Sequence, residues 1–172
     1  MISKKLEKAV NEQIQKETYS AYLYLAMAAY FAAQNLDGFA NWFYVQNQEE
    51  TYHAMKLHRY LIERGGEVEL MEIEKPPKDF ESPLKAFRAA LEHERFITKS
   101  INELYQKAID EQDPALASFL KWYVDEQVEE EASAEKIIAQ LELIEGYKPG
   151  LYHLDKELAA RVYTPPAEEA EE

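Results

Sequence analysis

The chain has 172 residues, of which 33 are acidic and 19 are basic, so its formal net charge at pH 7 is −14. It has no cysteine, which excludes a disulfide framework, a thiolate metal site and a cysteine nucleophile. The excess of acidic residues argues against nucleic acid as a partner. No apolar run approaches the roughly 20 residues of a membrane span, and the N-terminus lacks the pattern of a secretory signal. We therefore expect a cytoplasmic protein without a membrane partner.

Five helices are predicted from capping residues and helix breakers. They span about residues 4–35, 38–65, 83–111, 114–145 and 150–161. Ser3, Ser82 and Asp113 are residue types that cap helix N-termini, and a proline follows the last two at the first helical position. Gly65, followed by Gly66, is typical of a helix C-terminus.

The lengths of the connections predict how the four long helices are arranged. The turns between helices one and two and between helices three and four are short, so each pair should be antiparallel. The middle connection, residues 67–81, contains Pro76 and Pro77, which exclude a helix. Extended, it reaches roughly 50 Å, enough to run the length of a helix. The chain is therefore predicted to be an all-α four-helix bundle with one long crossover between helices two and three, plus a short fifth C-terminal helix.

We expect a single domain over residues 1–163. In the fifth helix Leu151, Leu154 and Leu158 share one face, which could pack on the same bundle or on another subunit. The remaining residues, 164–172, are rich in glutamate and are expected to be a disordered tail.

Each long helix interrupts its apolar stripe near its middle with polar side chains. At 100° per residue these positions lie inside the stripe, where a core side chain is expected. They are Glu17 in the first helix, Glu50 and His53 in the second, Glu94 in the third, and Gln127 and Glu130 in the fourth. If the four stripes form one core, all six side chains meet at its centre.

Four buried carboxylates require a counter-charge. An unpaired buried charge costs several kcal/mol, and like charges raise one another's pKa. Taken singly, a glutamate such as Glu17 or Glu94 is more often a boundary residue than a ligand, and the E-x-x-H of Glu50 and His53 also occurs by chance. The joint pattern predicts a metal site. Oxygen donors with one imidazole disfavour structural zinc and copper, and the ligand count fits two ions of iron or manganese.

From about Ser3 to Tyr163 the chain resembles the non-haem ferritins of bacteria and archaea, in the ferritin-like di-iron carboxylate family. The resemblance is carried by Glu17 with Tyr24, by residues 48–53 (QEETYH), by residues 93–94 (HE) and by residues 126–131 (EQVEEE). It implies a ferritin-like bundle whose function is iron storage and detoxification. Such a protein oxidises Fe(II) with O₂ or peroxide at a di-iron ferroxidase centre and stores Fe(III) as a mineral inside a homo-oligomeric shell of 24 subunits.

The resemblance also implies a role for each polar residue of the centre. Glu17, Glu50 and His53 would bind the first iron, Glu50 would bridge, and Glu94 with Glu130 would bind the second. Two further residues lie beside them by this comparison: Gln127, which would bind or orient the oxygen species, and Tyr24, which would donate an electron or a hydrogen bond.

A third iron site is implied by the same resemblance. Glu49, Glu126 and Glu129 match its carboxylates in prokaryotic ferritins, although all three flank the apolar stripe and could instead be solvated side chains. Haem is not expected, because Tyr52 stands where bacterioferritin has its haem-binding methionine.

Two other functions remain open at this point. A di-iron oxidase or peroxidase of the rubrerythrin-like class would turn over without storing iron, but it usually carries a second E-x-x-H or a cysteine module, whereas this fourth helix reads QVEE at 127–130. A metal-free interaction protein would tolerate alanine at Glu50 and His53.

Overall fold

The structure, a computed structural model, describes residues 1–165, and these form five helices. The helices are α1 (Lys4–Ala32), α2 (Asp37–Glu63), α3 (Pro83–Asp110), α4 (Pro114–Leu143) and α5 (Lys148–Leu158). The prediction of an all-α bundle with a short fifth helix is confirmed. None of the described helices is both long and apolar enough to cross a membrane. Residues 166–172, to which most of the expected tail belongs, lie outside the described residues.

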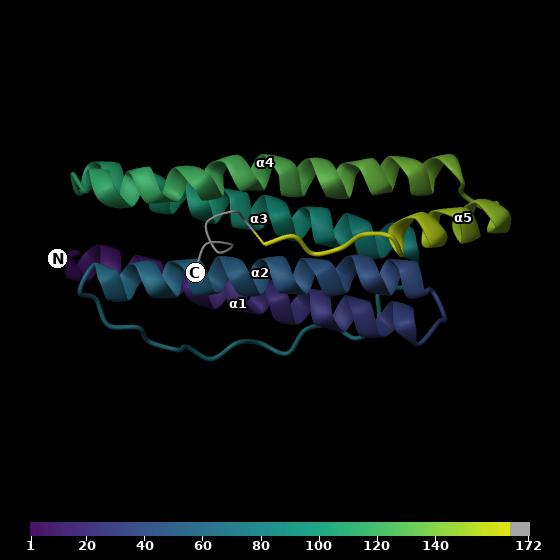
Figure 1. Ribbon diagram of the computed structural model, residues 1–172, viewed down its shortest axis with the longest axis horizontal. Helices are drawn as coiled ribbons and strands as arrows, with labels where there is room; N and C mark the ends of the chain where they lie inside the picture. Colours follow the sequence, from purple (N-terminus) through teal and green to yellow (C-terminus); the bar gives the residue numbers. More distant parts are fainter. Residues whose placement is uncertain (166–172) are drawn as a thin grey trace.

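The four long helices form two antiparallel pairs, α1 with α2 and α3 with α4 (Figure 1). The long connection from α2 to α3 runs along the α1 side of the bundle, as its length predicted. Side chains of α1 hold it there: Asn11 donates from Nδ2 to the carbonyl of Glu67 (2.9 Å) and accepts from the backbone N–H of Glu69 (2.9 Å), while Gln15 donates to the carbonyl of Glu72 (2.6 Å).

Side-chain caps begin three of the helices where the sequence placed them. Ser3 and Ser82 accept hydrogen bonds through Oγ from the backbone N–H three residues on, and Asp113 does so through Oδ1. The first helix ends at Ala32, before the expected residue 35, because Asn35 has a φ of 57° in the left-handed region, which an α-helix cannot continue.

The core consists of two apolar clusters separated by a polar layer. One cluster lies near the α5 end and is built around aromatic side chains, among them Phe31, Phe43 and Phe87. The other lies toward the chain's N-terminus and includes Ile14, Leu57, Ile101 and Leu116. Along every long helix the polar residues that the sequence analysis singled out fall between the two clusters, so the apolar halves supply the packing and enclose a polar centre.

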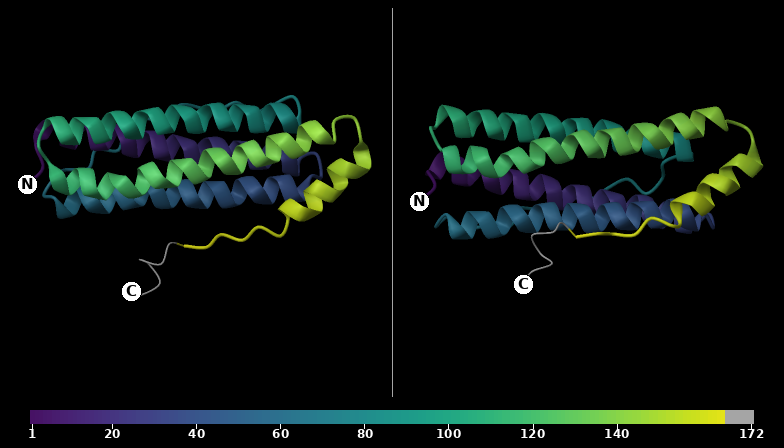
Figure 2. Two further views of the ribbon diagram at one scale, coloured as in Figure 1. Left: turned by 90° about the horizontal axis from the view of Figure 1, so that it is seen from above. Right: turned by 45° about the horizontal axis from the view of Figure 1, so that its top comes forward.

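Helix α5 packs on its own bundle (Figures 1 and 2). Leu154 and Leu158 are buried in the aromatic cluster, and Leu151 packs against it. The sequence left open whether this leucine face packs on its own bundle or on another subunit. The structure shows it packed on its own bundle.

Asp155 of α5 caps the start of α2, which has no side-chain cap of its own. Its Oδ1 accepts from the backbone N–H groups of Gly38 (2.8 Å) and Phe39 (3.2 Å). The approach is so close that a Cβ on Gly38 would lie 1.6 Å from the Asp155 carbonyl oxygen, so only glycine fits there.

Replacing this cap is expected to destabilise the fold. Asp155→Ala leaves two buried N–H groups at the start of α2 without their acceptor, which should cost about 1–2 kcal/mol and lower the Tm by roughly 3–6 °C. Thermal unfolding measures the effect, with the exposed neighbour Glu157→Ala as the matched control. Equal Tm values for the two variants would contradict the capping role.

Candidate metal centre

The six polar side chains that interrupt the apolar stripes all lie in the layer between the two clusters. Each is at most 5% exposed. The antiparallel pairing of α1 with α2 places Glu17 opposite Glu50 and His53, and donor atoms of these three residues lie within 4.8 Å of one another. His53 Nδ1 is 3.6 Å from Glu50 Oε2, as expected for residues at i and i+3 on one helix face.

The other two carboxylates come from the second helix pair and are held by neutral donors. The Tyr24 hydroxyl donates to Glu94 Oε1, and Gln127 Nε2 donates to Glu94 Oε2 (3.1 Å). Gln46 Nε2 donates to Glu130 Oε2 (2.7 Å). Both carboxylates are thereby fixed in direction at the centre of the bundle.

Within the described residues, three buried carboxylate oxygens accept no hydrogen bond from an N–H or hydroxyl group. They are Oε2 of Glu17 and both oxygens of Glu50, and these two carboxyls can share a proton with each other. An unsatisfied buried acceptor costs about 1–3 kcal/mol, and more when it is charged, so native proteins keep such atoms for an ion or a ligand. With carboxylate oxygens, one imidazole and one amide around them, these atoms fit a hard divalent cation such as Fe(II).

Burial controls the protonation of the centre. It raises the pKa of Glu17 to about 7 and raises the pKa of Glu50 and of Glu130 well above their usual range, assisted by the charge of Glu94. The pKa of His53 is lowered to about 3 by burial and by the nearby charge of Lys56, so its imidazole is neutral at pH 7. The centre therefore has a free imidazole lone pair, and its protonated carboxyls can exchange protons for metal.

Several residues that support the centre were missed from the sequence. Gln13 donates from Nε2 to Glu17 Oε1 (2.8 Å) and accepts from Ser100 Oγ (2.6 Å). Gln13 and Gln46 each stand four residues before a candidate ligand, one turn earlier on the same helix face. This four-residue spacing is the sequence signal that could have identified the two glutamines as part of the centre.

The three carboxylates assigned to a third site have different neighbours in the structure. Glu126 contributes a donor atom to a group with His53 and Glu130, again within 4.8 Å. Glu49 forms an ion pair with Arg161, at 2.7 Å between Oε2 and a guanidinium nitrogen. Glu129 is exposed and belongs to neither of the two groups.

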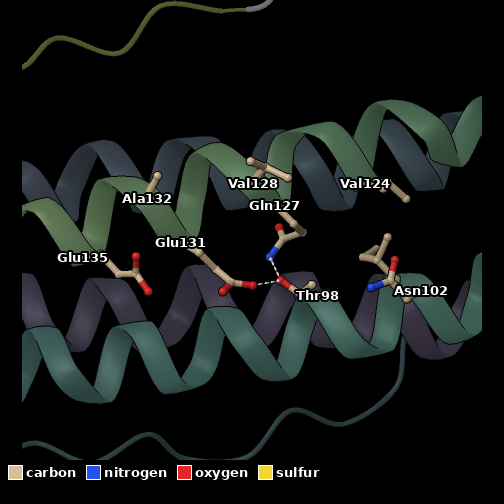
Figure 3. Close-up of a pocket in the computed structure, with 9 residues that line it drawn as sticks. Thr98, Asn102, Val124, Gln127, Val128, Glu131, Ala132 and Glu135 are labelled. Atoms are coloured by element: carbon tan, nitrogen blue, oxygen red, sulfur yellow. Dashed lines mark hydrogen bonds between the residues drawn. The ribbon is translucent and has the colours of Figure 1, made fainter.

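A pocket of about 410 Å³ opens between α3 and α4 beside Gln127 (Figure 3). Within it Thr98 Oγ1 donates to Glu131 Oε1 (2.5 Å) and accepts from Gln127 Nε2 (3.2 Å). The amide NH₂ of Gln127 can only donate, so the hydroxyl lone pair faces Gln127 and the hydroxyl proton goes to Glu131. The NH₂ group of Gln127 is thereby turned toward Thr98 and Glu94, and its carbonyl oxygen takes no part in these bonds.

Removing the Thr98 hydroxyl is expected to weaken the binding of a divalent cation such as Fe(II) at the centre. Thr98→Val keeps the shape but leaves the orientation of the Gln127 amide, which holds Glu94, undefined. The loss of such supporting contacts typically costs 10- to 100-fold, and we expect roughly 10-fold in the affinity for Fe(II) measured by calorimetry under nitrogen. Thr98→Ser keeps the hydroxyl and should retain most of the affinity. A valine variant that binds as tightly as the parent would show that this contact does not matter.

A buried centre of four carboxylates and one histidine, in a four-helix bundle with one long crossover, defines a ferritin-like carboxylate protein. Residues 7–144 match the ferritin-like domain family, and the chain belongs to the ferritin family.

Relatives of known name and structure agree with this. The chain is 43% identical over 156 residues to the bacterial non-haem ferritin of Campylobacter jejuni, covering 91% of this chain and 93% of that protein, and 39% identical over 163 residues to that of Staphylococcus aureus, covering 95% and 98%. The open-pore ferritin of Archaeoglobus fulgidus superposes with a TM-score of 0.93 at 52% identity, over 94% of this chain and all of that one. The resemblance to prokaryotic non-haem ferritins is confirmed.

Proposed function

We propose that each subunit binds two Fe(II) ions as substrate at the buried centre and oxidises them with O₂ or H₂O₂. The protein is a non-haem ferritin, an iron-storage protein with ferroxidase activity. In this proposal Glu17, Glu50 and His53 hold the first iron and Glu94 with Glu130 holds the second. The observation that carries it is that neither buried oxygen of Glu50 accepts a hydrogen bond from an N–H or hydroxyl group, because a carboxylate with both oxygens open in this way is suited to bridge two ions.

The protein's own groups supply placement and charge for this reaction. Anionic carboxylates stabilise Fe(III) more than Fe(II), so the centre favours loss of an electron from each ion. Tyr24, bound to Glu94, is close enough to donate a hydrogen bond or an electron, and Gln127 orients the oxygen species. His53 is fixed by its surroundings: the Tyr123 hydroxyl donates to its carbonyl (2.7 Å), and the Trp122 ring packs against its imidazole edge to face.

The rest of the proposal concerns storage. A third iron binds at Glu49, Glu126 and Glu129 on the way to a mineral, and 24 subunits enclose that mineral as a shell in the cytoplasm. Exposed large apolar side chains on α1, on α2 and on the connection after α2 support assembly, since exposed apolar groups in number mark contact surfaces. They are Tyr22, Leu25, Tyr44, Met55 and Leu70, each at least 41% exposed.

Aerobic loading with Fe(II), followed by size-exclusion chromatography with iron and protein measured in the same fractions, tests the function. Soluble iron far beyond two or three ions per chain, eluting with a large shell, is the expected result. Iron limited to two or three per chain in a small species would instead favour the rubrerythrin-like alternative and would overturn storage while leaving the metal centre intact.

A further inference from the structure

The chain turns back toward the bundle after α5. Residues 159–165 run along the α2 side (Figures 1 and 2). Asn41 of α2 anchors the start of this segment, donating from Nδ2 to the carbonyl oxygens of Leu158 (3.2 Å) and Arg161 (2.9 Å). The backbone at Arg161 is therefore held against α2.

The Arg161 side chain is fixed at three points. One guanidinium nitrogen is 2.7 Å from Glu49 Oε2, and the other donates to the carbonyl of Trp42 (3.3 Å). The guanidinium carbon lies 4.7 Å from the centre of the Trp42 ring, a cation–π contact. The Arg161 and Glu49 side chains are only 25% and 23% exposed, so this pair is better shielded from solvent than a surface ion pair.

The charges of this pair reach the metal centre. The negative charge of Glu49 raises the pKa of Glu126 and of Glu130, and the positive charge of Arg161 lowers the pKa of Glu130. Both effects are smaller than that of burial. Arg161 is thus a fixed positive charge at the edge of the carboxylate cluster.

We infer that Arg161 occupies the cation position at Glu49 in the iron-free protein and competes with the third iron for that carboxylate. The inference rests on the proposed third site and deepens it. A metal ion recruits Glu49 only after the Arg161–Glu49 pair breaks, so Arg161 weakens the third site relative to the two iron positions of the centre. Those two fill first, because within residues 1–165 none of their ligands, Glu17, Glu50, His53, Glu94 or Glu130, forms an ion pair with an arginine.

Calorimetric titration of the assembled protein with Fe(II) under nitrogen tests this in low salt. For Arg161→Gln we expect affinity at the third site to rise by about 5- to 10-fold, the effect of releasing one partly buried ion pair, with a smaller change at the first two sites, which Arg161 reaches only through its charge on Glu130. Arg161→Lys keeps the charge and should bind the third ion much as the parent does. Adding Glu49→Gln to Arg161→Gln should abolish the gain, because the carboxylate that was released is then absent.

Each other result overturns the inference in a recognisable way. Equal third-site affinity in the parent and in Arg161→Gln would show that Arg161 does not compete, while the third site itself would stand. No third ion in either protein would remove the third site and with it the role of Arg161. Weakening of all three sites in Arg161→Gln would assign Arg161 a structural role only, which a fall in Tm would accompany.

Discussion

Glu50→Gln is expected to slow the first phase of Fe(II) oxidation by at least about 100-fold without lowering the Tm of the iron-free protein. Supporting contacts around metals are worth 10- to 100-fold, and Glu50 is placed to ligate both ions. The same residue is a liability without iron, because both its oxygens are buried without an N–H or hydroxyl donor, and burial and three other carboxylates disfavour its charged form. A neutral amide of the same shape removes that cost. Stopped-flow mixing with two Fe(II) per subunit, together with thermal unfolding of the iron-free protein, measures both effects.

Glu63→Gln is the matched control, since Glu63 is an exposed glutamate on the same helix. It should oxidise iron at the parent rate with an unchanged Tm. Oxidation at the parent rate in Glu50→Gln would remove Glu50 from the centre. Lost activity accompanied by a large fall in Tm would make Glu50 a structural residue and would contradict the reading of its free oxygens as ligand atoms.

The candidate centre was accessible to sequence reasoning because its residues violate a simple pattern. A carboxylate inside an apolar stripe, as at Glu17 or Glu94, stands out in any helix, and antiparallel helices of similar length bring their midpoints together. The arrangement in two antiparallel pairs followed in the same way from the lengths of the connections. A linker that contains Pro76 and Pro77 cannot be helical, and it is longer than a turn between adjacent helix ends requires, so it was expected to run the length of the bundle.

What the sequence could not reveal depends on the relative placement of distant elements. Thr98 is an ordinary helix residue until the register of α3 against α4 brings it between Gln127 and Glu131. Arg161 meets Glu49 across 112 residues only because α5 folds back on α2. Asp155 becomes the cap of α2 for the same reason. Side-chain identity restricts which contacts are chemically suitable, but the tilt of a helix decides which of them form.

The stability that Glu17 contributes to the iron-free protein is expected to fall as the pH rises from about 4.5 to about 7, and a bound divalent ion should abolish this loss. Glu17 has a pKa of about 7 in the fold against 4.5 for a free side chain, because burial penalises its charge. In that window the Glu17 side chain binds more protons in the folded state than in the unfolded chain, so its contribution to stability falls as the pH rises. His53 and His93, whose pKa burial lowers, change stability in the opposite direction, so the effect is measured by changing Glu17 alone. A shift of this size corresponds to about 3 kcal/mol per subunit, fully present below pH 4.5 and lost above pH 7.

Comparison with Glu17→Gln separates this effect from the general repulsion of an acidic chain. The variant cannot ionise at residue 17, so its stability relative to the parent should increase by about 3 kcal/mol between pH 4.5 and pH 7.5, as measured by urea unfolding of the iron-free proteins. A difference that stays constant with pH would mean that Glu17 is already ionised in the fold.

The same linkage can be tested from the side of the metal. Calorimetry with Zn²⁺ as a redox-silent probe at pH 6, in two buffers of different ionisation enthalpy, should show proton release from the parent and less from Glu17→Gln. Metal then replaces the protons that neutralise the buried carboxylates in the iron-free protein. The four carboxylates that weaken the iron-free fold at neutral pH would thus be the source of its affinity for iron.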